Sequence, residues 1–263
     1  MVEVNGAHLY YEEKGRGHPL ILLHAGIADS RMWDDQFEIF SRAYRVIRFD
    51  LRGFGRSSMP PGSFSNYEDV RGLMDSLKVE EAYLLGNSFG GLIALDFTLA
   101  YPSYAKALVL VAPSVSGTKP SERIKHFWEQ EDLALESGDY EEATQLNLKL
   151  WVDGPHRTKE QVNSDVRDRV REMQLAIFKK DIPDETEEIG LDPPALGRLG
   201  EVGVPVLAMI GELDLEEKLN LAEILERELI DCRKVTIPGA AHMLSMEKVE
   251  EFNRNVLDFL SRI

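Results

Sequence analysis

The sequence predicts an α/β fold built on a mainly parallel sheet. Seven short apolar segments that have the character of strands alternate along the chain with longer segments that have the character of helices. Most of the strand-like segments are unbroken runs of Val, Ile and Leu, which is typical of strands that helices cover on both faces. Strands separated by helices tend to pair in parallel, because each helix returns the chain to the same end of the sheet.

The predicted elements follow one another regularly in the first and last parts of the chain. The strand-like segments are residues 8–14, 19–25, 44–51, 81–87, 106–113, 204–211 and 233–239. The helix-like segments between them are residues 30–43, 66–77, 92–100 and 215–230. A chain of 263 residues is long enough for one large α/β domain, with or without an inserted subdomain.

The alternation stops between residues 117 and 197, where no strand-like run occurs. Three helical patterns lie in this stretch, and the apolar residues of the clearest are spaced by four, four, three and four positions: Val162, Val166, Val170, Met173 and Ile177. We therefore predict an α/β core of residues 1–116 and 198–263, interrupted by a helical cap at 117–197. Open α/β sheets bind ligands at the carboxyl ends of their strands, so we expect the cap to cover that edge.

Composition and charge exclude several classes of function. Lys and Arg number 30 against 46 Asp and Glu, and the resulting net charge of −16 repels nucleic acid and anionic membrane surfaces. Cys232 is the single cysteine, so neither an internal disulfide nor a thiolate metal cluster is expected. The N-terminal residues do not show a basic start followed by an apolar run, which is the pattern of a signal peptide. No apolar run approaches the length of a membrane-spanning helix. We expect a cytoplasmic protein with a small-molecule substrate; the oligomeric state stays open.

A Gly-Asn-Ser-Phe-Gly motif, Gly86 to Gly90, joins a predicted strand to a predicted helix. This is the context in which G-x-S-x-G forms a sharp turn that presents a nucleophilic serine above a sheet. The two glycines relieve the crowding of such a turn, and the helix that follows directs its N-terminal amides at the reaction centre. Ser88 is therefore the candidate nucleophile.

A nucleophilic serine needs a base that an acid holds in place. Of the six histidines, His242 follows the last strand-like segment. Asp214 follows the preceding one, four residues after Ile210. The chain order Ser88, Asp214, His242 is the order of serine, acid and histidine in one particular fold.

These residues, together with the segments "LLHAG" and "FDLRGFGRSS", resemble the α/β-hydrolase superfamily over nearly the whole chain. The resemblance implies a mostly parallel eight-stranded sheet with helices on both faces and a helical cap inserted after the sixth strand. Similar small members include esterases, 3-oxoadipate enol-lactonases and cofactor-free haloperoxidases. A serine nucleophile argues against the aspartate-dependent dehalogenases and epoxide hydrolases. No cofactor is expected, and no histidine or aspartate cluster has the spacing of a metal site.

The resemblance also implies an oxyanion hole made by the backbone N–H groups of Gly26 and Phe89. In the "His24-Ala25-Gly26" segment, Ala25 stands where the family usually has glycine. This difference bears on the conformation of the loop and not on the backbone N–H donor of Gly26. We expect His24 to be a structural, hydrogen-bonded residue. In the cap, Trp151 is the candidate pocket residue.

These features predict a carboxylic ester hydrolase that acts on small, mainly apolar esters or lactones through an acyl-enzyme on Ser88. One alternative is a hydrolase of carbon–carbon bonds in ring-cleavage products, a class of enzyme whose nucleophile turn resembles the Gly-Asn-Ser-Phe-Gly motif of this chain. Such an enzyme must bind a substrate carboxylate, and the candidates by position, Arg123, Arg157 and Arg167, are expected to be solvated helix charges. A different alternative is a catalytically silent binding protein with this fold.

Overall fold

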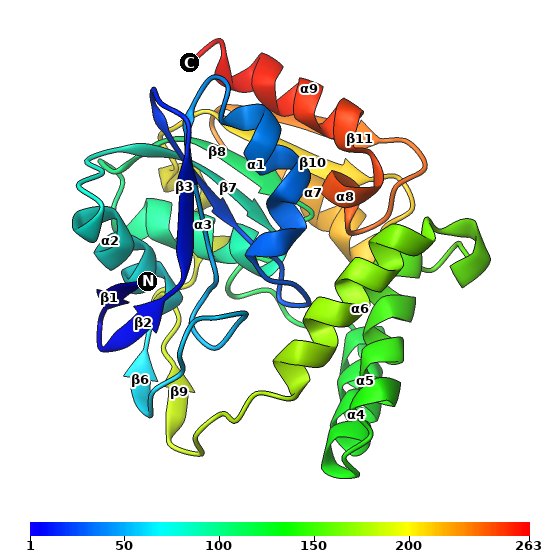
Figure 1. Ribbon diagram of the computed structural model, residues 1–263. Coiled ribbons are helices and arrows are strands. Elements are labelled where there is room, and N and C mark those ends of the chain that lie inside the picture. The colour runs from blue at the N-terminus through cyan, green and yellow to red at the C-terminus, as the bar shows by residue number, and fades with distance from the viewer.

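The computed structural model describes residues 1–263 and is organised around a seven-stranded sheet (Figure 1). In spatial order its strands are β11 (Cys232–Ile237), β10 (Val206–Gly211), β8 (Ala105–Val111), β7 (Ala82–Asn87), β4 (Pro19–Leu23), β5 (Arg45–Phe49) and β3 (Tyr11–Lys14). Every neighbouring pair is parallel except β3 and β5. The predicted mainly parallel α/β sheet is confirmed.

Helices cover both faces of this sheet and bury a core on each side. One core receives α1 (Asp34–Phe40), α8 (Leu244–Glu247) and α9 (Val249–Leu260), and the other receives α2 (Asn66–Ser76), α3 (Phe89–Ala100) and α7 (Glu216–Glu228). Successive side chains of a strand point to opposite faces, so Leu20 and Leu22 join the first core while Ile21 and Leu23 join the second. Both faces are buried, which explains why the strands are continuous apolar runs.

The main sheet has seven strands instead of the eight that the family resemblance implies. The first two strands, β1 (Val2–Val4) and β2 (Ala7–Leu9), pair only with each other. A loop occupies part of the other edge of β2: the N–H of His8 donates to Ser58 Oγ, and the carbonyl of His8 accepts from the N–H of Ser58. The strand expected at 8–14 is therefore split, and only its second part, β3, joins the sheet.

The inserted segment contains three helices and a π-helical turn, but it is not entirely helical. The longer helical parts are α4 (Glu122–Glu136), α5 (Tyr140–Asn147), the π-helical turn (Leu148–Asp153) and α6 (Ser164–Phe178), and two short 3₁₀ turns lie at Lys159–Gln161 and Ala195–Gly197. Figure 1 shows α4, α5 and α6 grouped to one side of the core. The expectation of an all-helical insertion is wrong near its end, where β9 (Thr186–Glu188) pairs in parallel with β6 (Gly62–Phe64) as the chain returns to the core.

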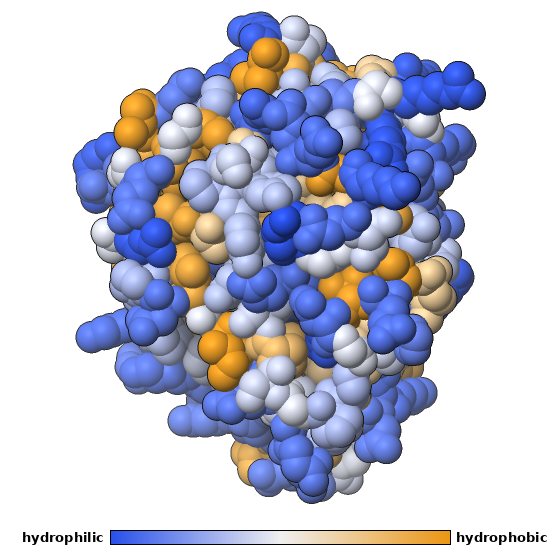
Figure 2. Space-filling view, turned by 90° about the vertical axis from the view of Figure 1, so that its left-hand side faces the viewer, coloured by the Kyte–Doolittle hydropathy of each residue, from blue (hydrophilic) through white to orange (hydrophobic).

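The surface agrees with the high content of charged residues, which make up 29% of the chain. The face in Figure 2 is mostly hydrophilic, and its apolar residues form small separate groups. No helix of the structure is both long enough and apolar enough to cross a membrane.

Candidate active site

Ser88 occupies the sharp turn between β7 and α3. Its backbone has φ +52° and ψ −108°, a combination that costs a non-glycine residue roughly 1–3 kcal/mol and persists only where the surroundings enforce it. Hydrogen bonds enforce it here, because the N–H of Ser88 donates to the Val111 carbonyl at 2.9 Å and its carbonyl accepts from the N–H of Ser114 at 3.0 Å. The turn is anchored to the end of β8.

Gly86 and Gly90 allow the turn to be this tight. A Cβ atom at Gly86 would lie 2.2 Å from the carbonyl oxygen of Gly90, and one at Gly90 would lie 2.3 Å from the carbonyl oxygen of Leu23. Hard-sphere repulsion forbids such contacts with backbone atoms. Both positions therefore exclude any side chain, which is the physical basis of the glycine spacing around Ser88.

Asp214 and His242 form a buried pair at the carboxyl ends of β10 and β11. Their side chains are 1% and 2% exposed, and His242 Nδ1 lies 2.9 Å from Asp214 Oδ2. The other oxygen, Oδ1, accepts a hydrogen bond of 2.7 Å from the N–H of Leu215. A carboxylate only accepts, so we assign the imidazole proton to Nδ1, which leaves Nε2 free to take a proton.

The loops that carry this pair are held together by close backbone packing. A Cβ atom at Gly211, the last residue of β10, would lie 2.2 Å from the carbonyl oxygen of Ala241. The histidine loop can approach β10 this closely only because residue 211 is glycine. The structure also places Ser88 and His242 in the walls of one cavity of about 390 Å³. All three predicted residues thus lie at the carboxyl ends of strands of the main sheet.

The two expected oxyanion donors lie side by side at the same cavity. Gly26 and Phe89 both line it, and a Cβ atom at Gly26 would lie 3.6 Å from the Cβ of Phe89. The N–H groups of Gly26 and Phe89 donate to no other protein atom. Ala25 has no positive φ, so alanine fits the loop without strain. The two N–H groups are therefore available to a ligand.

His24 is a structural residue, as predicted. It is fully buried, its Nδ1 lies 2.9 Å from the carbonyl oxygen of Ala25, and its Nε2 accepts from the N–H of Leu51 at 2.9 Å. Burial lowers the pKa of His24 and keeps the ring neutral. Because both ring nitrogens are engaged, the residue fastens the loop after β4 to the end of β5.

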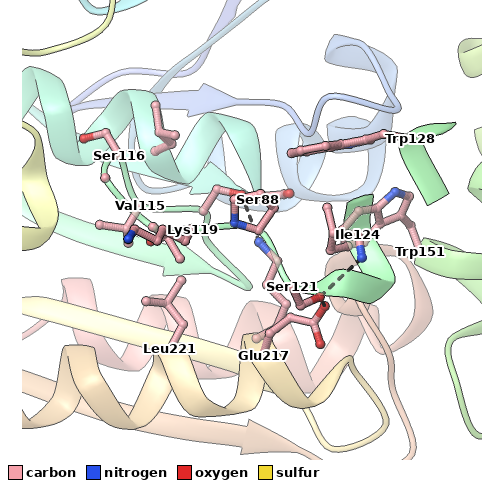
Figure 3. A pocket seen from close by; sticks show the side chains of 16 residues that line it. Ser88, Val115, Ser116, Lys119, Ser121, Ile124, Trp128, Trp151, Glu217 and Leu221 are labelled. Carbon is pink, nitrogen blue, oxygen red and sulfur yellow. Dashed lines mark hydrogen bonds between the residues drawn. The ribbon is translucent and has the colours of Figure 1, made fainter. Parts of the chain in front are cut away.

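Trp151 lies between Phe127 of α4 and His242 and lines the cavity beside Ser88. Its ring centroid is 4.7 Å from that of His242 and 6.2 Å from that of Phe127. It belongs to the π-helical turn after α5, a type of irregularity that is frequent at functional sites. Figure 3 shows Ser88 in the middle of a second cavity, of about 480 Å³, with Trp151, Trp128 and Ile124 to one side. No group of three or more His, Cys, Asp or Glu residues is arranged to hold a metal ion.

Comparison with known sequences agrees with this geometry. The sequence profile of the α/β-hydrolase fold matches residues 18–249, a span that includes Ser88, Asp214 and His242. The chain belongs to the α/β-hydrolase family.

Several proteins resemble this α/β-hydrolase over almost their whole length. The 2-hydroxy-6-oxo-6-phenylhexa-2,4-dienoate hydrolase of Comamonas testosteroni is 28% identical over 269 residues, which cover 96% of this chain and 91% of the relative. The crystal structure of the enol-lactonase from Burkholderia xenovorans LB400 has a TM-score of 0.79 at 23% identity and covers 98% of each chain. A hydrolase from Pseudomonas aeruginosa PA01 has a TM-score of 0.80 at 27% identity, covering 99% of this chain and 97% of the other.

Lys218 is a cavity residue of this α/β-hydrolase that the sequence did not single out. It lies in the first turn of α7 and lines the same cavity as Ser88. Its Nζ donates to Ser114 Oγ at 2.9 Å and to the carbonyl oxygen of Pro113 at 3.2 Å. Burial lowers the pKa of Lys218 to about 8, against the opposing effect of the carboxylates of Asp214 and Glu217. The only signal in the sequence is its position four residues after Asp214.

The three arginines considered as carboxylate ligands do not line either cavity that contains Ser88. Arg157 forms an ion pair with Glu247, and Arg167 forms one with Asp153, at 3.0 Å. All four of these side chains are mostly buried, so the expectation of solvated charges is wrong for Arg157 and Arg167. Both instead fasten the inserted segment internally or to the core. Arg123 is exposed, as expected.

Proposed function

We propose that this α/β-hydrolase cleaves small, mainly apolar carboxylic esters or lactones through an acyl-enzyme on Ser88. One observation carries the proposal: a serine held in a strained turn shares a cavity with His242, whose ring is bound to the buried carboxylate of Asp214. Serine needs a base of this kind to become a nucleophile, and the base needs an acid that fixes its tautomer. This arrangement supports covalent acyl transfer.

In the first half of the proposed reaction, Ser88 Oγ attacks the ester carbonyl while Nε2 of His242 takes its proton. Asp214 stabilises the imidazolium that forms, and the N–H groups of Gly26 and Phe89 donate to the oxyanion. The imidazolium then gives its proton to the departing alkoxide oxygen. The products of this half are the alcohol and an acyl ester on Ser88.

In the second half, a water molecule attacks the acyl ester and His242 again acts as the base. Collapse of the tetrahedral intermediate returns the proton to Ser88 and releases the carboxylic acid. A lactone follows the same steps, except that the departing alkoxide stays part of the released hydroxy acid.

We further propose that residues 117–197 act as a cap and that Trp151 shapes the acyl pocket. Phe127, Trp151 and Phe178, all from this segment, line the cavity beside His242. Their apolar surface favours an apolar group of the substrate and keeps bulk water from the acyl-enzyme. In this proposal the core residues supply the chemistry, and the segment 117–197 shapes the apolar part of the pocket.

The alternative function is hydrolysis of a carbon–carbon bond. The relative from Comamonas testosteroni is named as a hydrolase of 2-hydroxy-6-oxo-6-phenylhexa-2,4-dienoate, and the match, at 28% identity, covers 96% of this chain. This sequence similarity supports carbon–carbon cleavage. The support is as strong as that which the structural similarity to the enol-lactonase gives to the ester proposal. Both proposals place Ser88, His242 and Asp214 at the reaction centre, so they differ in the substrate.

A substrate panel tests the two proposals against each other. The panel contains 4-nitrophenyl esters of increasing acyl length, an enol-lactone and a vinylogous 1,5-diketone, each assayed for kcat/KM. We expect the best ester or lactone to exceed the diketone at least tenfold, about 1.4 kcal/mol of transition-state binding. A diketone that is turned over faster than every ester would make carbon–carbon cleavage the better account. Absence of turnover with all of them would support a silent binding protein.

A further inference from the structure

The space around Ser88 consists of two arms with different chemistry. The lysine arm, of about 480 Å³, includes Lys218 and the hydroxyl-bearing segment 114–121. The aromatic arm, of about 390 Å³, includes His242 and the aromatic side chains of the inserted segment. Ser88, Trp128 and Trp151 line both arms. A substrate whose scissile carbonyl lies at Ser88 can therefore extend into both.

The lysine arm carries an ammonium group that has no carboxylate bonded to it. Both hydrogen bonds of Lys218 go to neutral oxygens, those of Ser114 and Pro113, so one of its three N–H donors remains for a ligand. The nearby carboxylate of Glu217 accepts from Ser121 Oγ at 2.8 Å. Figure 3 shows Lys119 on the opposite side of Ser88 from Trp128 and Trp151. Lys119 is exposed and lies in the wall of the arm, whose lining also includes the carboxylate of Glu217.

Beyond the oxyanion donors next to Ser88, the aromatic arm disfavours an anion. No Lys or Arg lines it, and its one acidic group, Glu131, is bonded to Asn147 Nδ2. Burial raises the pKa of Glu131, which reflects the poor solvation of charge in this arm. A substrate with one charged end and one apolar end would therefore bind in a single orientation.

We propose that Lys218 binds a carboxylate of the substrate in the lysine arm while the apolar end of the substrate occupies the aromatic arm. The inference rests on the proposed function and narrows its substrate class to esters or lactones that carry a carboxylate on one side of the scissile carbonyl. A partly buried ammonium group with no carboxylate hydrogen-bonded to it has lost part of its solvation, and a bound carboxylate would supply a charge-assisted hydrogen bond. The Trp151 ring, 5.9 Å from Nζ, also favours the cationic form.

The test compares two esters of equal length, monoethyl glutarate and ethyl pentanoate, with acid release followed by titration at constant pH. Wild-type protein is expected to prefer the hemiester, monoethyl glutarate. Lys218→Met is expected to lower the ratio of kcat/KM for monoethyl glutarate to kcat/KM for ethyl pentanoate by roughly 30-fold, the effect of one charge-assisted hydrogen bond. Lys149→Met is the matched control, because Lys149 is exposed and lies outside both arms. A ratio that stays within threefold of wild type in Lys218→Met would overturn the inference.

The pH dependence separates recognition from a structural role of the side chain. Lys218, with its pKa near 8, loses its proton between pH 7 and pH 9, so the wild-type preference for the hemiester should fall over that range. The charged groups around it are Asp214 and Glu217, with Lys119 and His242 in the adjoining walls. Lys218→Arg keeps its charge, and its ratio should stay level from pH 7 to pH 9. A parallel fall in both proteins would contradict the assignment to Lys218.

A binding measurement distinguishes failure of this inference from failure of the proposed function. In the Ser88→Ala background, calorimetry should show monoethyl glutarate binding at least roughly tenfold more tightly than ethyl pentanoate, and adding Lys218→Met should remove the difference. If wild type hydrolyses neither ester but the binding difference is present, the proposed function fails and the inference stands. If the binding difference is absent, the inference fails whatever the activity.

Discussion

Replacing Ser88 by alanine is expected to lower kcat/KM by a factor on the order of 10⁴ or more, because it removes the nucleophile and leaves only the oxyanion donors and substrate binding. The fold should not change. The turn around Ser88 is held by its backbone hydrogen bonds to Val111 and Ser114, which alanine keeps. The measurement is hydrolysis of a short 4-nitrophenyl ester, with thermal unfolding recorded for both proteins.

Ser103→Ala is the matched control for this change. Ser103 is an exposed serine after α3, and its substitution should leave kcat/KM and the melting temperature near the wild-type values. Activity of Ser88→Ala within tenfold of wild type would show that another group attacks the substrate.

Asp214→Asn is expected to lower kcat by a factor on the order of 10⁴. The N–H of Leu215 donates to one oxygen of Asp214, so the amide oxygen of asparagine would stay there and the NH₂ group would face Nδ1 of His242. That contact places the imidazole proton on Nε2, and the ring can then no longer accept a proton from Ser88. The loss should appear in kcat more than in KM.

Glu212→Gln is the control for this second change. Glu212 lies two residues earlier in the same loop, is exposed, and accepts from the N–H of Gly239 at 3.0 Å. Its substitution should cost far less than that of Asp214, as should the same change at Asp192 or Asp231. A larger loss for Glu212→Gln would mean that the acid lies two residues before Asp214.

The parts of this fold that the sequence predicts well are those with a local cause. Continuous apolar runs mark the sheet because each strand is buried on both faces. Every strand of the main sheet lies inside a predicted segment or begins one residue before it. The turn at Ser88 is visible because steric exclusion at Gly86 and Gly90 acts on neighbouring residues. Asp214 and His242 can be selected because each follows a recognisable strand.

The parts that the sequence does not reveal depend on contacts between distant segments. The β1–β2 pair stays outside the main sheet because loop residue Ser58, fifty positions away, bonds to His8. The pairing of β9 with β6 is similarly remote. In the sequence, Lys218 looks like any charged residue of an amphipathic helix. Its place in the cavity depends on how α7 packs against the loop after β8.

Covalent labelling of the nucleophile tests the central claim most directly. Diethyl 4-nitrophenyl phosphate reacts with an activated serine, releases one equivalent of 4-nitrophenol and leaves a stable diethylphosphoryl ester. Mass spectrometry of a tryptic digest should place one adduct on peptide 79–106, which contains two serines, Ser88 and Ser103. Fragmentation should assign the adduct to Ser88, in step with loss of ester hydrolysis. An adduct on another residue, or intact activity after full labelling of Ser88, would contradict the account.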